Sequence, residues 1–156
     1  MEPVSIVNQF KEFGVASVLV FSAIGSCLGV MAAGLSAVGA WKKGFVKNKP
    51  TPFIPLLAFI GAPLSQTFYG MILMNKIAEV VSKGGGDYLW LIGGFAGVVI
   101  GLSAAIQGKI GAAAADAMGE SDKGFTNYIA AMGIIESVAI FVMVFSLQVI
   151  KKLVGI

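Results

Sequence analysis

The 156-residue sequence contains no arginine and no histidine, and it has a single cysteine, Cys27. One cysteine excludes a disulfide within the chain and a cysteine-based metal site. Only 12% of the residues are charged, too few to cover the surface of a soluble domain of this length. The net charge of +3 comes entirely from lysines at the ends of apolar runs, which indicates membrane topology and not nucleic-acid binding.

Long apolar runs dominate what is present: 57% of the residues are hydrophobic, and the mean hydropathy is +0.90. Unbroken apolar runs long enough to cross a bilayer form helices, since a barrel would show alternation. The first run is too long for a signal-peptide core and is expected to be retained. We therefore predict an all-α membrane protein with four transmembrane helices, at about 13–41, 53–76, 88–118 and 125–150.

The two halves of the chain resemble each other. Small residues recur every fourth position in the odd runs, and such faces allow close approach of helix backbones. A shift of 70 residues places Gln66 on Glu136 in the even runs. We predict a duplicated helical hairpin, with the first hairpin at 1–82 and the second at 83–156. The recurring small residues are Gly25, Gly29, Ala33 and Ala37 in the first run and Gly93, Gly97, Gly101 and Ala105 in the third.

Glu136 is the only charge between residues 125 and 150, and it lies near the middle of that run. A carboxylate at bilayer mid-depth costs about 2.5 kcal/mol or more, so such residues are usually functional. Ser65, Gln66, Tyr69 and Gln107 are expected at a similar depth in the second and third runs. This all-oxygen set with one negative charge favours a monovalent cation or a proton, because divalent ions normally bind more carboxylates.

Each neutral member of this set also has a structural explanation. A buried glutamine often joins helices, a tyrosine often packs, and a serine often bonds its own helix. Pro63 is expected to kink the second run, and Asp116, Glu120 and Asp122 are interpreted as solvated charges. A structural scaffold would leave Glu136 unexplained. A small four-helix transporter would have its glutamate in the first run, which has no charge here.

Three segments resemble the rotor-ring subunit of V-type ATPases, also called the proteolipid. The resemblance covers nearly the whole chain and is strongest for the sodium-binding members. It implies an ion-carrying protein with one carboxylate in the last span. The segments are Pro63-Leu64-Ser65-Gln66-Thr67-Phe68-Tyr69-Gly70, Ala105-Ile106-Gln107-Gly108-Lys109 and Ile135-Glu136-Ser137.

The resemblance also implies a ligand set for Na⁺, with H⁺ as the alternative. Tyr69 would orient the glutamate, and Ser65 stands where the family often has threonine. The expected ligands are Glu136, Gln66, Gln107, Ser65 and the carbonyl of Ala62.

The implied partners are further copies forming a homo-oligomeric ring, a stator subunit supplying the arginine that this chain lacks, a central-stalk subunit, and membrane lipid. The first and third spans would line the inside of the ring. No nucleic acid is expected. The chain lacks a G-x-x-x-x-G-K-[ST] loop, so we expect a non-catalytic subunit of an ion-translocating ATPase.

Lysines suggest an orientation in the cell membrane for this multi-pass chain. The first loop contains Lys42, Lys43, Lys47 and Lys49, which places the first and third loops in the cytoplasm and both termini outside. The pair Lys151 and Lys152 at the C-terminus argues weakly for the opposite orientation.

Overall fold

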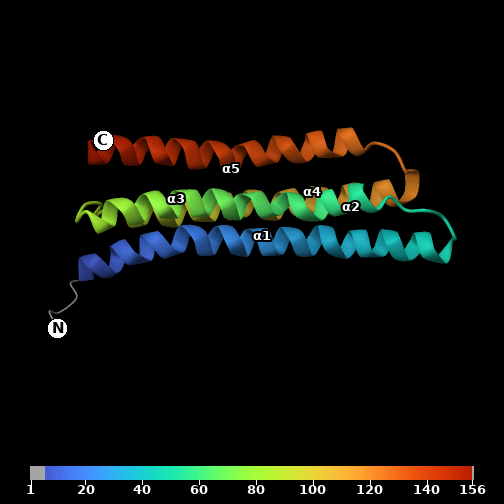
Figure 1. The fold of residues 1–156 in the computed structure, drawn as a ribbon, viewed down its shortest axis with the longest axis horizontal. Coiled ribbons are helices and arrows are strands. Elements are labelled where there is room, and N and C mark those ends of the chain that lie inside the picture. The colour runs from blue at the N-terminus through green and yellow to red at the C-terminus, as the bar shows by residue number, and fades with distance from the viewer. Residues whose placement is uncertain (1–5, 156) are drawn as a thin grey trace.

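The computed structural model describes residues 6–155, and it is a bundle of long helices that run parallel or antiparallel to one another (Figure 1). Within this range there is no strand. Residues 1–5 and 156, at the outer ends of the two predicted hairpins, lie outside the described residues. The elements are α1 (Ile6–Val46), α2 (Phe53–Gly61), the 3₁₀ turn η1 (Ala62–Leu64), α3 (Ser65–Ser82), α4 (Leu89–Ser121) and α5 (Phe125–Val154).

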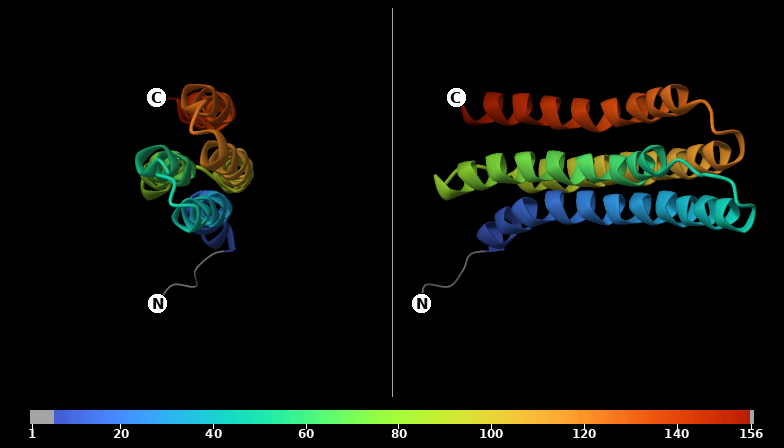
Figure 2. Two further views of the ribbon diagram at one scale, coloured as in Figure 1. Left: turned by 90° about the vertical axis from the view of Figure 1, so that its right-hand side faces the viewer. Right: turned by 45° about the vertical axis from the view of Figure 1, so that its right-hand side comes forward.

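Four helical stretches of the described chain are long and apolar enough to cross a membrane. Seen end-on, α2–α3 and α4 lie between α1 and α5 (Figure 2). Helices α1 and α4 run in one direction and α2–α3 and α5 run back, so both described ends lie at the same end of the bundle (Figure 1). The prediction of an all-α membrane fold is confirmed. The stretches are Gln9–Val46, Phe53–Ser82, Leu89–Ser121 and Phe125–Val154.

Helices α1 and α4 pack backbone against backbone. A Cβ atom added at Gly25 would collide with the backbone of Gly101, and one at Gly29 with the backbone of Ala104. The small residues of the two odd spans therefore face each other, as small-residue faces do in membranes. The expected position Ala105 is only partly buried, because the face continues through Ala104 and Gly108. A helix has 3.6 residues per turn, so a strict four-residue stripe drifts off the contact.

Both odd helices extend beyond the apolar runs that predicted them. Helix α1 continues through Lys42 and Lys43 to Val46, because lysine is a good helix former. The chain turns only at Asn48, where φ is 50°, shortly before Pro50. The loop predicted to begin at residue 42 is thus shorter than expected.

Ion pairs join the ends of α1 and α4. Lys43 pairs with Glu120, and Lys49 Nζ donates to the backbone oxygen of Glu120 at 3.2 Å. Glu120 is exposed but ion-paired, so its interpretation as a merely solvated charge was wrong. At the opposite end, the nearly buried Lys11 pairs with Asp87 at 2.7 Å. Exposed pairs of this kind contribute at most about 1 kcal/mol each.

Candidate functional site

The carboxylate of Glu136 on α5 receives one hydrogen bond from each of two other helices. Tyr69 on α3 donates its hydroxyl to Oε1 at 2.8 Å. Gln107 on α4 places its Nε2 at 3.4 Å from Oε2. The two carboxylate oxygens are therefore oriented by different elements, and Glu136 itself is only partly buried.

The two glutamines are fully buried and bonded to each other. Gln66 Nε2 donates to Gln107 Oε1 at 2.9 Å, and Gln107 Nε2 donates to the carbonyl of Met132 at 3.1 Å. Buried amides require such partners, since an unpaired one costs roughly 1–3 kcal/mol. The pair brings amide oxygens from α3 and α4 to the level of Glu136.

A break in the second span presents two more oxygens. Pro63 has no backbone N–H and sits in the 3₁₀ turn η1 between α2 and α3, as its predicted kink requires. The hydroxyl of Ser65 lies 2.9 Å from the carbonyl oxygen of Ala62 and 3.1 Å from Gln66 Oε1. One hydroxyl proton can serve only one of these acceptors at a time. The hydroxyl can therefore rotate and turn its own lone pairs toward a cation.

All the residues predicted for the site are brought together by this chain of contacts: Ala62, Ser65, Gln66, Tyr69, Gln107 and Glu136. The site offers carboxylate, amide, hydroxyl, phenol and backbone carbonyl oxygens, but a single carboxylate. Among residues 6–155, no group of three or more His, Cys, Asp or Glu side chains could hold a metal ion. The donor set suits a monovalent cation or a proton better than a divalent ion, which normally requires more negative charge.

Two cross-helix bonds next to the site were not predicted. Ser103 on α4 donates to the carbonyl of Ile135 at 2.9 Å, directly before Glu136. Thr67 Oγ1 bonds Ser26 Oγ at 2.8 Å and joins α3 to α1 beside Gln66. Ser103 lies four residues before Gln107 and so on the same helix face, which is the sequence signal that could have identified it.

Fold and site together define a multi-pass membrane protein with an ion-binding carboxylate held between three helices. Comparison with protein families gives the class more closely: residues 91–149 match the ATP synthase C-subunit family. The matched stretch contains both Gln107 and Glu136 and leaves residues 1–90 outside. A search of curated protein sequences finds no match to the chain.

The family match indicates an ion-carrying rotor-ring proteolipid of an ATP synthase or ATPase. Members of this family form homo-oligomeric rings in the ATPase complex. The chain is accordingly a non-catalytic membrane subunit, in agreement with the expectation from its missing phosphate-binding loop.

Proposed function

We propose that the chain is the rotor-ring subunit of a V-type ATPase and that it carries Na⁺ at Glu136. The observation that supports sodium most is the number of oxygens gathered around one carboxylate. The proposed ligands are Glu136, Gln66, Gln107, Ser65 and the carbonyl of Ala62, with Tyr69 orienting the glutamate.

Charge neutralisation is the central step of the proposed mechanism. Bound Na⁺ cancels the charge of Glu136, so the loaded site can pass lipid at low cost. At the stator the ion leaves, and the free carboxylate requires a positive partner. This chain has no arginine, so another subunit must supply it. A separate central-stalk protein would couple turning of the ring to ATP.

The membrane arrangement that we propose follows the lysines and the duplicated hairpin. Lysines 42, 43, 47 and 49 would place the first and third loops in the cytoplasm. Segments 1–82 and 83–156 would be the two copies of one hairpin. The second copy retains its acid as Glu136, and Gln66 stands in the corresponding place of the first.

A proton-carrying rotor subunit is the second candidate. A proton needs only the carboxylate and one hydrogen-bond partner, and Tyr69 supplies that partner to Glu136. A proton site would give Gln66, Gln107 and Ser65 no ligand role. Their presence favours sodium.

The direct test is carbodiimide modification of the purified ring across a sodium titration at fixed pH, with mass spectrometry to locate the adduct. Carbodiimides attack protonated, membrane-buried carboxyls. We expect modification of Glu136 that Na⁺ suppresses and K⁺ at equal ionic strength does not. Modification indifferent to Na⁺ would support the proton-carrying alternative, and no modification at any pH would refute an ion site at Glu136.

A second prediction concerns the amide ligand from α4. Gln107→Ala removes one proposed ligand oxygen, so the sodium concentration needed for half-maximal transport should rise about tenfold. Gln148→Ala is the matched control, because Gln148 is exposed near the end of α5 and should leave that concentration unchanged. An unchanged sodium dependence in Gln107→Ala would argue that protons are carried.

A further inference from the structure

Two side chains of α4 reach across to the backbone of α5 beside Glu136. Ser103 donates to the carbonyl of Ile135 at 2.9 Å, and Gln107 donates to that of Met132 at 3.1 Å. Ser103 and Gln107 are one helical turn apart and point to the same side of α4. Ser103 is almost fully buried, at 3% exposure. The α5 backbone is thus bonded to α4 at the turn that ends in Glu136.

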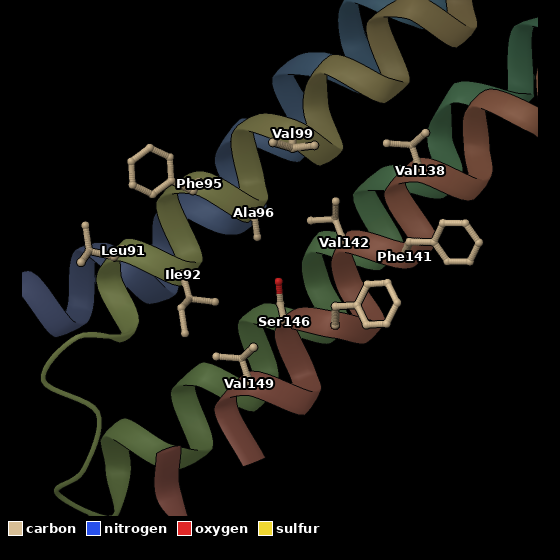
Figure 3. A pocket seen from close by; sticks show the side chains of 11 residues that line it. Leu91, Ile92, Phe95, Ala96, Val99, Val138, Phe141, Val142, Ser146 and Val149 are labelled. Atoms are coloured by element: carbon tan, nitrogen blue, oxygen red, sulfur yellow. The ribbon is translucent and has the colours of Figure 1, made fainter. Parts of the chain in front are cut away.

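Beyond Ser103, toward the chain ends, α4 and α5 separate. An open groove of about 590 Å³ lies between them, and Val99, one turn from Ser103, already lines it. Figure 3 shows Val99 and Val138 on opposite sides of this groove, with the α5 side chains spaced along its wall. Only Met132, Ala139 and Ile150 are buried along the whole of α5. Packing alone therefore holds this helix weakly.

We infer that Ser103 is a positioning residue for the ion site. Its hydroxyl fixes the carbonyl of the residue directly before Glu136. That contact sets where the Glu136 backbone lies relative to Tyr69 and Gln107, the two side chains that bond its carboxylate. Ser103 touches no proposed ligand oxygen, so it acts through the helix. This inference rests on the proposed function of the site.

The bond is not needed to satisfy a buried group. In a regular helix the Ile135 carbonyl already accepts the backbone N–H of Ala139, so the Ser103 hydroxyl is a second donor. Losing it leaves no orphaned polar atom and should not prevent folding. The buried Ser22 behaves differently, because its hydroxyl bonds Val18 of its own helix at 2.7 Å. Among these two, only the Ser103 hydroxyl joins two helices.

The test compares three variants of the purified ring in the sodium-protection assay of Glu136 modification. Ser103→Ala should raise the half-protecting sodium concentration about threefold to tenfold, the effect expected for one interhelical bond in a membrane protein. Ser103→Thr keeps the hydroxyl and should restore protection to within about twofold. Ser22→Ala removes an equally buried hydroxyl and should change nothing. An unchanged value in Ser103→Ala, or an equal shift in Ser22→Ala, would overturn the inference.

Amide hydrogen exchange separates this inference from the proposed sodium function. Exchange of the amides at 136–139 should be faster in Ser103→Ala than in the wild type and unchanged in Ser22→Ala, whichever ion is carried. If wild-type Glu136 gains no protection from Na⁺, the sodium proposal fails and this exchange measurement decides the role of Ser103. Equal exchange in Ser103→Ala and the wild type would refute a tether.

Discussion

Glu136→Gln is expected to abolish ion transport by the assembled ATPase while the chain still inserts into the membrane. Glutamine keeps the shape of the side chain but cannot lose a proton or neutralise a cation. No other carboxylate lies in the apolar part of α5, so none can replace it. Burying a neutral amide is also easier than burying a charge, so insertion should not suffer. Transport of ²²Na⁺ or protons into vesicles containing the complex measures the effect.

Glu79→Gln is the matched control for this experiment. Glu79 is an exposed glutamate near the end of α3, where it pairs with Lys76 at 2.8 Å and Lys83 at 2.7 Å. Exposed pairs contribute little, so this variant should transport like the wild type. Transport that survives in Glu136→Gln, with the ring assembled to the normal extent, would contradict the assignment of the site.

Gly25→Ala is expected to damage the bundle more than any other single methyl group added to α1. The new Cβ would lie within bonding range of the Gly101 backbone, which cannot rotate away as a side chain could. The two helices would have to separate, at a cost of about 1–3 kcal/mol or more. We expect a lower thermal midpoint for the ring in detergent and a lower yield of assembled ring.

Gly34→Ala tests whether this loss comes from the contact and not from the substitution itself. Gly34 lies on the same helix, but a Cβ there meets nothing within 4 Å. Alanine is the better helix former by about 1 kcal/mol, so this variant should be neutral or slightly more stable. Equal destabilisation by the two substitutions would show that the α1–α4 contact does not limit stability.

The number and type of the helices could be predicted because membrane spans depend on the length and apolarity of a run, which the sequence states directly. The helix ends could not, since residues such as Lys42 and Lys43 are polar yet continue α1. The break at η1 was expected only as a kink at Pro63. Its consequence, a Ser65 hydroxyl set against the Ala62 carbonyl, depends on the local backbone geometry.

The site was predictable from two sources with different reach. Glu136 stands out because a charge in the middle of an apolar run is costly, and the polar residues of similar depth follow from counting along the spans. The Ala62 carbonyl came only from the family resemblance, since a backbone oxygen has no residue signature. Ser103 was missed for the same reason: its partner is the carbonyl of Ile135.

The close contact of α1 with α4 has a mechanical consequence. Backbones that touch without intervening side chains form a beam with little elastic give, whereas α5 is joined to the rest by a few bonds and borders an open groove. Torque on the turning ring would pass along the stiff α1–α4 beam, and elastic strain would concentrate in α5. The helix that bears Glu136 is therefore the compliant part of the rotor, so the site can yield locally while the shaft around it keeps its shape.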